Sequence, residues 1–116
     1  MTTYPLLFGF RDLVAGRGFF AEIAVDGRAI LVEEEDASFW MYGVNPGAIA
    51  AGGDCTGAAR SEFRSLYRSV LFDFAGVAED FAELKQLVAD FFNQTNEDNE
   101  ARWAAAVKQV RAGLYR

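Results

Sequence analysis

The most conspicuous residues with chemical potential are three arginines, Arg60, Arg64 and Arg68, which follow one another at intervals of four in the printed sequence. Residues at this spacing lie on one face of a helix, so together they predict a basic stripe. Such a stripe could bind phosphates or the carboxylates of a partner protein. It could equally be a solvated face balanced by neighbours such as Glu62. We include the three arginines among the candidate binding residues.

Trp40 and Tyr42 form the second candidate site. In an extended strand they lie on the same face, while Phe39 points to the opposite one. Aromatic rings arranged in this way could stack on a base or another flat ligand. The alternative is that they pack in the core, as most aromatic side chains do.

Residues 47–54, GAIAAGGD, lie between this strand and a predicted helix, where backbone N–H groups could receive an anion. The spacing matches neither of the common glycine-rich phosphate loops, and Asp54 places a negative charge where a phosphate would lie. The alternative is a flexible connector. Cys55 follows directly; it could be a reactive thiol at a helix start or a small buried hydrophobic residue.

Several kinds of catalysis are excluded by composition. The chain has no His, so a Ser-His-Asp triad, a Cys-His pair and an imidazole metal site are impossible. The run Glu33 to Asp36 is acidic, but consecutive residues alternate in direction and do not converge on one ion. A hydrolase would have to bring carboxylates together from separate elements, for example from Glu22, Asp26 and Asp73, with Glu33. We expect no catalytic residue, no metal and no cofactor.

The chain has 116 residues, of which 52% are hydrophobic, and a single Cys. This is enough for one domain with its own core, and it rules out an intrachain disulfide. The net charge of −6 opposes attraction to nucleic acid and favours a basic partner protein. No membrane span or signal peptide is predicted, and we expect a soluble cytoplasmic protein.

The hydrophobic pattern predicts an α+β fold with a three- or four-stranded antiparallel sheet. Residues 18–34 read as a β-hairpin that turns at Asp26-Gly27, which would place Val25 opposite Arg28. The other predicted elements are an apolar strand over 6–14, a strand over 38–44 and helices over 56–75, 80–92 and 97–112. Residues 1–94 would form the domain, and 95–116 would supply a helix that packs on the domain or on a partner.

Pro46-Gly47 after a strand, Gly53-Asp54 after a short loop, and Ala59 in the following helix resemble the core pattern of the HicB antitoxin family. The resemblance covers about residues 18–75. It implies a degraded ribonuclease-H-like fold without catalysis, which binds and neutralises a small basic toxin. Apart from the resemblance, exposed sheet edges or the surplus of aromatic residues could form a homodimer. The alternative function is a small-ligand or nucleotide-binding domain that uses the 47–54 loop with Trp40 and Tyr42.

Overall fold

The structure is a computed structural model, and it describes residues 2–113. Four antiparallel strands form one sheet in the order β1-β2-β3-β4, and three helices follow them in the chain. This arrangement confirms the α+β class. The elements are β1 (Thr2–Gly16), β2 (Phe19–Glu33), β3 (Phe39–Asn45), β4 (Ala50–Gly53), α1 (Thr56–Val77), α2 (Phe81–Asn93) and α3 (Glu97–Arg111).

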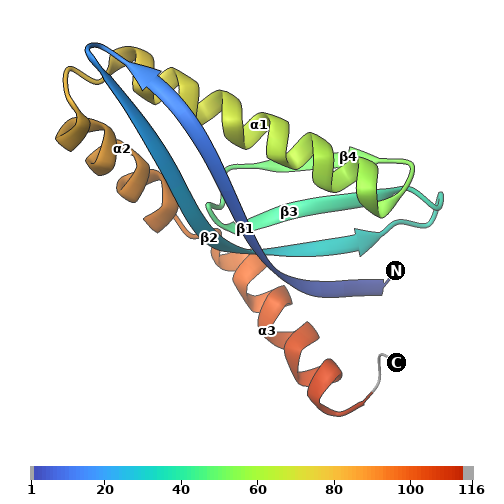
Figure 1. Ribbon diagram of the computed structural model, residues 1–116. Helices are drawn as coiled ribbons and strands as arrows, with labels where there is room; N and C mark the ends of the chain where they lie inside the picture. The colour runs from blue at the N-terminus through green and yellow to red at the C-terminus, as the bar shows by residue number, and fades with distance from the viewer. Residues whose placement is uncertain (1, 114–116) are drawn as a thin grey trace.

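The sheet is strongly curled and forms half of a barrel (Figure 1). β1 and β2 are both 15 residues long and pair with each other over their whole length. The end of β1 and the start of β2 extend beyond β3 as a two-stranded arm. The register between β2 and β3 shifts between Arg28 and Ala29, and an irregularity of this kind bends a strand and increases its twist.

The predicted hairpin over 18–34 is wrong, because β2 runs straight through Asp26-Gly27. These two residues pair with Gly9 and Phe8 of β1, and the hairpin turn lies instead at Arg17-Gly18. Gly18 has the positive φ, 74°, that such a turn requires. Val25 therefore lies opposite Phe10 and not opposite Arg28. A long partner strand on the N-terminal side overrides the local preference of the Asp-Gly dipeptide for a turn.

α1 lies along the concave face of the sheet and buries one row of side chains at four-residue spacing. The row consists of Ala59, Phe63, Tyr67, Leu71 and Ala75, all at most 1% exposed. The apolar spacing in the sequence predicts a wider stripe, which also includes Leu66, Val70 and Phe74. Leu66 is 40% exposed, so the buried row is narrower than that prediction.

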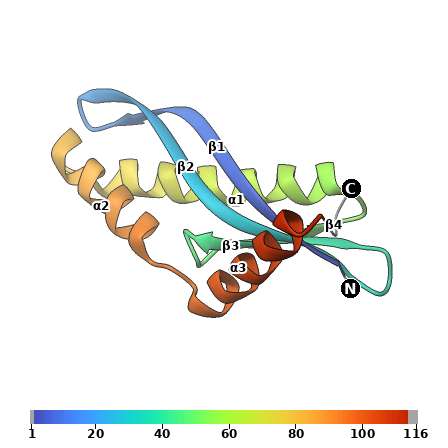
Figure 2. The same ribbon diagram turned by 90° about the horizontal axis from the view of Figure 1, so that it is seen from below.

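α2 begins after its cap, Asp80, whose carboxylate accepts a hydrogen bond from the Glu83 N–H at 2.8 Å. It packs beside α1 through an edge-to-face contact of Phe91 with Phe74. α3 lies on the opposite, convex face of the sheet (Figures 1 and 2). There Trp103 and Tyr42 cover a small second core of Ile30, Val32 and Val44.

Two further details differ from the sequence prediction. Residues 50–53 of the expected connector form β4, which pairs with β3 and makes the sheet four-stranded. The caps of two helices also differ. Residue type predicts Asp54 or Thr56 as the cap of α1 and Thr95 as the cap of α3, but the caps are Cys55 and Asn96.

The other boundaries agree with the prediction to within a few residues. α3 packs on the domain itself, while the division into residues 1–94 and 95–116 stays a prediction. Within residues 2–113, no helix has the length and apolar character needed to cross a membrane.

Substitution of Gly27 tests the observed register. A Cβ on Gly27 would lie 2.5 Å from the Asn45 carbonyl oxygen and 2.5 Å from the Phe8 ring. We expect Gly27→Ala to lower the free energy of unfolding by about 1–3 kcal/mol, because backbone and core must shift. Gly76 in α1 has nothing near the added carbon. As a matched control, Gly76→Ala should raise stability by about 0.5–1 kcal/mol in urea unfolding. Equal effects of the two changes would contradict the register.

Candidate functional site

Trp40 and Tyr42 lie side by side on the convex face of β3, as their spacing predicted. Their rings stack with centroids 6.0 Å apart and an interplanar angle of 19°. Trp40 is 39% exposed and lies over Gly52 of β4, where a Cβ would come within 2.5 Å of the indole. Tyr42 is half-buried against the second core. The pair is therefore a supported aromatic platform with one side open to solvent.

Carboxylates surround one end of this platform. Glu34, Glu35, Asp36, Ser38 and Trp40 line an open depression of about 380 Å³. The Tyr42 hydroxyl donates a long hydrogen bond of 3.5 Å to Glu34. Together the platform and these residues form what we call the acidic aromatic surface: Glu34, Glu35, Asp36, Ser38, Trp40 and Tyr42.

The chemistry of the acidic aromatic surface favours the binding of cations. Asp36 accepts hydrogen bonds from the Ser38 hydroxyl at 2.6 Å and the Ser38 N–H at 3.0 Å, and these bonds lower the pKa of the Asp36 carboxyl. Burial, and then the charge of Glu34, raises the pKa of Tyr42, so the phenol stays neutral. The Arg102 guanidinium already lies over the Tyr42 ring, 5.6 Å from its centroid. The surface thus combines negative charge with aromatic faces, both of which attract cations.

The arginine stripe lies elsewhere, on the flank of α1 that faces β1. Arg64 and Arg68 approach the same oxygen of Asp12, at 3.5 Å and 3.1 Å. Arg60 and Arg64 lie over the ring of Phe10, each 5.4 Å from its centroid. The structure therefore brings the three arginines together but separates them from Trp40 and Tyr42, which lie on the other face of the sheet.

Asp12 is the residue of this site that sequence reasoning missed. It is 8% exposed and is the one buried charged residue in the described part of the chain. Its position could have been found from the alternation of Phe8, Phe10 and Val14, which places every second residue of β1 on the buried face. A carboxylate in such a row needs cations nearby, because burial without them costs too much free energy.

Three buried polar atoms in this cluster have no hydrogen-bond partner within residues 2–113. They are Oδ2 of Asp12, Nε of Arg64 and the hydroxyl of Tyr67. Burial raises the pKa of Tyr67 far above its ordinary value, and the nearby charge of Asp12 adds to the effect. The phenol is therefore a neutral donor that is available for a hydrogen bond.

Most of the 47–54 segment is packed against neighbouring elements or paired in the sheet. Gly47 packs against Asn96, where a Cβ would be 2.4 Å from the backbone nitrogen, and residues 50–53 belong to β4. At the start of α1 the Ala58 N–H donates to the Cys55 sulfur at 3.4 Å, so the helix end is capped by its own chain. Cys55 is exposed and is not the buried residue of the alternative interpretation.

Within residues 2–113, no group of three or more Cys, Asp or Glu side chains is placed to hold an ion. Glu22, one of the carboxylates considered for hydrolysis, is paired with Arg11 at 2.6 Å.

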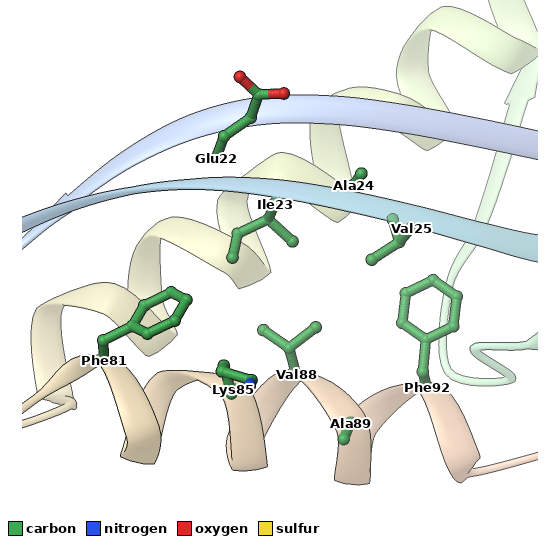
Figure 3. Close-up of a pocket in the computed structure, with 9 residues that line it drawn as sticks. All are labelled: Glu22, Ile23, Ala24, Val25, Phe81, Lys85, Val88, Ala89 and Phe92. Carbon is green, nitrogen blue, oxygen red and sulfur yellow. The ribbon is translucent and has the colours of Figure 1, made fainter.

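An apolar groove of about 340 Å³ lies between β2 and α2, and sequence reasoning did not find it (Figure 3). Ile23 and Val25 approach it from the strand, while Phe81, Val88 and Phe92 point toward them from the helix. Lys85 lies at its border. No periodicity in the sequence indicates such a gap, because it depends on the distance between two packed elements.

Comparison with known proteins adds no relative: no protein-family model, curated protein or solved structure matches the chain. The functional inference therefore depends on the site geometry.

Removing Asp12 and removing its two arginines should lower the stability of the protein by different amounts. Asp12→Asn removes the buried charge, and Arg64 and Arg68 can turn to water because their side chains are 43% and 50% exposed. We expect this variant to lose about 1–2 kcal/mol of unfolding free energy. The double variant R64A/R68A leaves a buried carboxylate without a cation and should lose about 3 kcal/mol or more. Urea unfolding of both variants measures the difference, and a larger loss for Asp12→Asn would contradict the arrangement.

Proposed function

We propose that the chain is a non-enzymatic protein-interaction module that binds a basic segment of a partner protein through the acidic aromatic surface. The observation that carries the proposal is the exposed stack of Trp40 on Tyr42 next to Glu34, Glu35 and Asp36. A Lys or Arg side chain of the partner would lay its apolar stem along the rings and direct its charge to the carboxylates.

The electrostatics support a protein partner over a nucleotide. A phosphate approaching Trp40 would meet three carboxylates, one of which is held ionised by its hydrogen bonds to Ser38. The net charge of −6 also repels anions and steers basic proteins toward the chain. The contact with Arg102 is an intramolecular example of the same recognition, since a guanidinium lies over Tyr42.

An antitoxin-like role is the more specific form of this proposal. It comes from the resemblance of Pro46-Gly47, Gly53-Asp54 and Ala59 to the HicB core pattern. In that form of the proposal, the partner is a small basic toxin that the chain binds and neutralises. The acidic aromatic surface is where we place the contact.

The test uses the full chain as bait in extracts of its source cell at low salt, and then the purified partner. We expect Trp40→Ala to weaken binding of that partner at least tenfold, because Trp40 supplies most of the exposed aromatic area. Glu35→Gln should weaken it less and should reduce the dependence of the association rate on salt.

Leu7→Ala is the matched control, because Leu7 is 78% exposed on β1, away from the surface. It should leave the affinity unchanged. Recovery of a partner whose binding is insensitive to both Trp40→Ala and Glu35→Gln would contradict the proposal.

A small-ligand-binding role is the second candidate, favoured by the apolar groove between β2 and α2. In this role the groove, and not the 47–54 loop, holds the ligand. A screen of small apolar carboxylates by thermal shift tests it, because a ligand at one hundred times its Kd stabilises the fold by about 2.7 kcal/mol. Val88→Trp should fill the groove and abolish the shift. A shift that survives in this variant would place the ligand elsewhere.

A further inference from the structure

The arginine stripe and β1 run side by side. Phe10 contacts Arg60 and Arg64, and Asp12, two residues further along the strand, contacts Arg64 and Arg68. Two residues of strand therefore correspond to four residues of helix. The lengths agree, since two strand residues span about 6.8 Å and four helical residues about 6.0 Å.

This boundary between β1 and α1 carries excess positive charge. Arg64 and Arg68 contact the carboxylate of Asp12, and Arg60 lies beside them over the Phe10 ring, so these four side chains carry two excess positive charges. Arg60 has no ion-pair contact with Asp12 and is exposed. In a chain whose net charge is −6, a local cationic row of this kind is unusual and favours an anionic partner.

The cluster also contains unused hydrogen-bonding capacity. The Nε of Arg64 is buried and has no hydrogen-bond partner within residues 2–113. Buried donors in native structures are nearly always satisfied, so a group that lies against this boundary and accepts hydrogen bonds would be stabilising.

β1 is itself an edge strand. It is the first strand of the sheet and pairs only with β2 over residues 2–16. Near its start the indole N–H of Trp103 donates to the Leu6 carbonyl at 3.3 Å, so α3 covers that part. The stretch from Phe8 to Val14 lies beyond this contact, beside the arginines. An uncovered edge offers backbone N–H and C=O groups to an added strand.

We propose that β1 accepts an extended acidic segment of a partner protein as an additional strand, with carboxylates at every second residue bound by Arg60, Arg64 and Arg68. The added strand pairs with the β1 backbone. Every second residue of the added strand faces α1. The distance between two such residues matches the spacing between successive arginines of the stripe. This binding site is on the opposite face of the sheet from the acidic aromatic surface, and it does not depend on the function proposed above.

A second copy of the chain fits this site poorly. Pairing β1 with β1 of another protomer would bring two arginine stripes together, and like charges in that position are destabilising. Single-stranded nucleic acid could supply charges, but it cannot continue a backbone ladder and is repelled by the net charge of −6.

The probe is a synthetic peptide in which Glu alternates with Thr and Val, titrated into the full-length chain. A peptide of the same composition with its Glu residues consecutive is the spacing control. We expect the alternating peptide to bind at least tenfold more tightly than the control. Its binding should slow hydrogen exchange of amides between Phe8 and Val14, because they enter a new ladder.

Arg60→Glu is the informative variant, since Arg60 makes no ion pair with buried Asp12 and its loss should not unfold the protein. It should weaken the alternating peptide about tenfold. Arg11→Glu makes the same charge change on the exposed face of β1, where Arg11 is paired with Glu22. It should weaken binding no more than about twofold, and Trp40→Ala should have no effect.

Equal binding of the two peptides, or unchanged affinity in the Arg60→Glu variant, would overturn the proposal. Exchange protection outside β1 would overturn it too. Tighter binding of a thymidine oligonucleotide than of the alternating peptide, with the same dependence on Arg60, would also overturn it and would identify the stripe as a phosphate site.

Discussion

The structure depends on the full-length pairing of β1 with β2. Fifteen residues of each strand form one ladder, and this ladder determines which side chains face α1 and which face solvent. It places Asp12 beneath the arginines and keeps Gly27 inside a strand. It also makes β1 the edge of the sheet. The shift in register at Arg28, where β3 joins, then curls the sheet around α1.

The curled sheet separates two surfaces of opposite character. On the convex face, carboxylates surround the stacked rings of Trp40 and Tyr42. On the concave side, at the β1 edge, Arg64 and Arg68 contact one buried carboxylate, and Arg60 lies beside them over the Phe10 ring. Because the sheet and its core lie between them, the two groups of charges do not neutralise each other. The two proposed interactions therefore use different residues on opposite faces of the sheet.

Much of the fold could be predicted from the sequence, because its signals are local. The row that includes Phe63, Tyr67 and Leu71 predicts α1, and Asp80 with Glu83 predicts the start of α2. The hairpin could not be predicted in the same way. Asp26-Gly27 is a strong local turn signal, but pairing with a distant strand outweighs it. β4 was missed for a similar reason, since Ala50 to Gly53 have little strand preference and are held by β3.

The candidate sites could also be predicted only in part from the sequence. The shared face of Trp40 and Tyr42 follows from strand periodicity, and the stripe of arginines follows from helix periodicity. What each group contacts does not follow from periodicity. Glu34 next to Tyr42, Asp12 beneath Arg68 and the groove beside Val88 all depend on contacts between separate elements. These contacts determine the charge and the shape of each surface.

The most direct test of this account is the measurement of inter-strand nuclear Overhauser contacts in the labelled protein. The account predicts backbone contacts between Phe10 and Val25 and between Leu6 and Ala29, which are opposite each other in the ladder. Contacts between Val25 and Arg28 across a turn at Asp26-Gly27, with no contacts from β1, would contradict it. In that case Asp12 would have no fixed place beneath the arginines, and the edge of β1 would not exist as described.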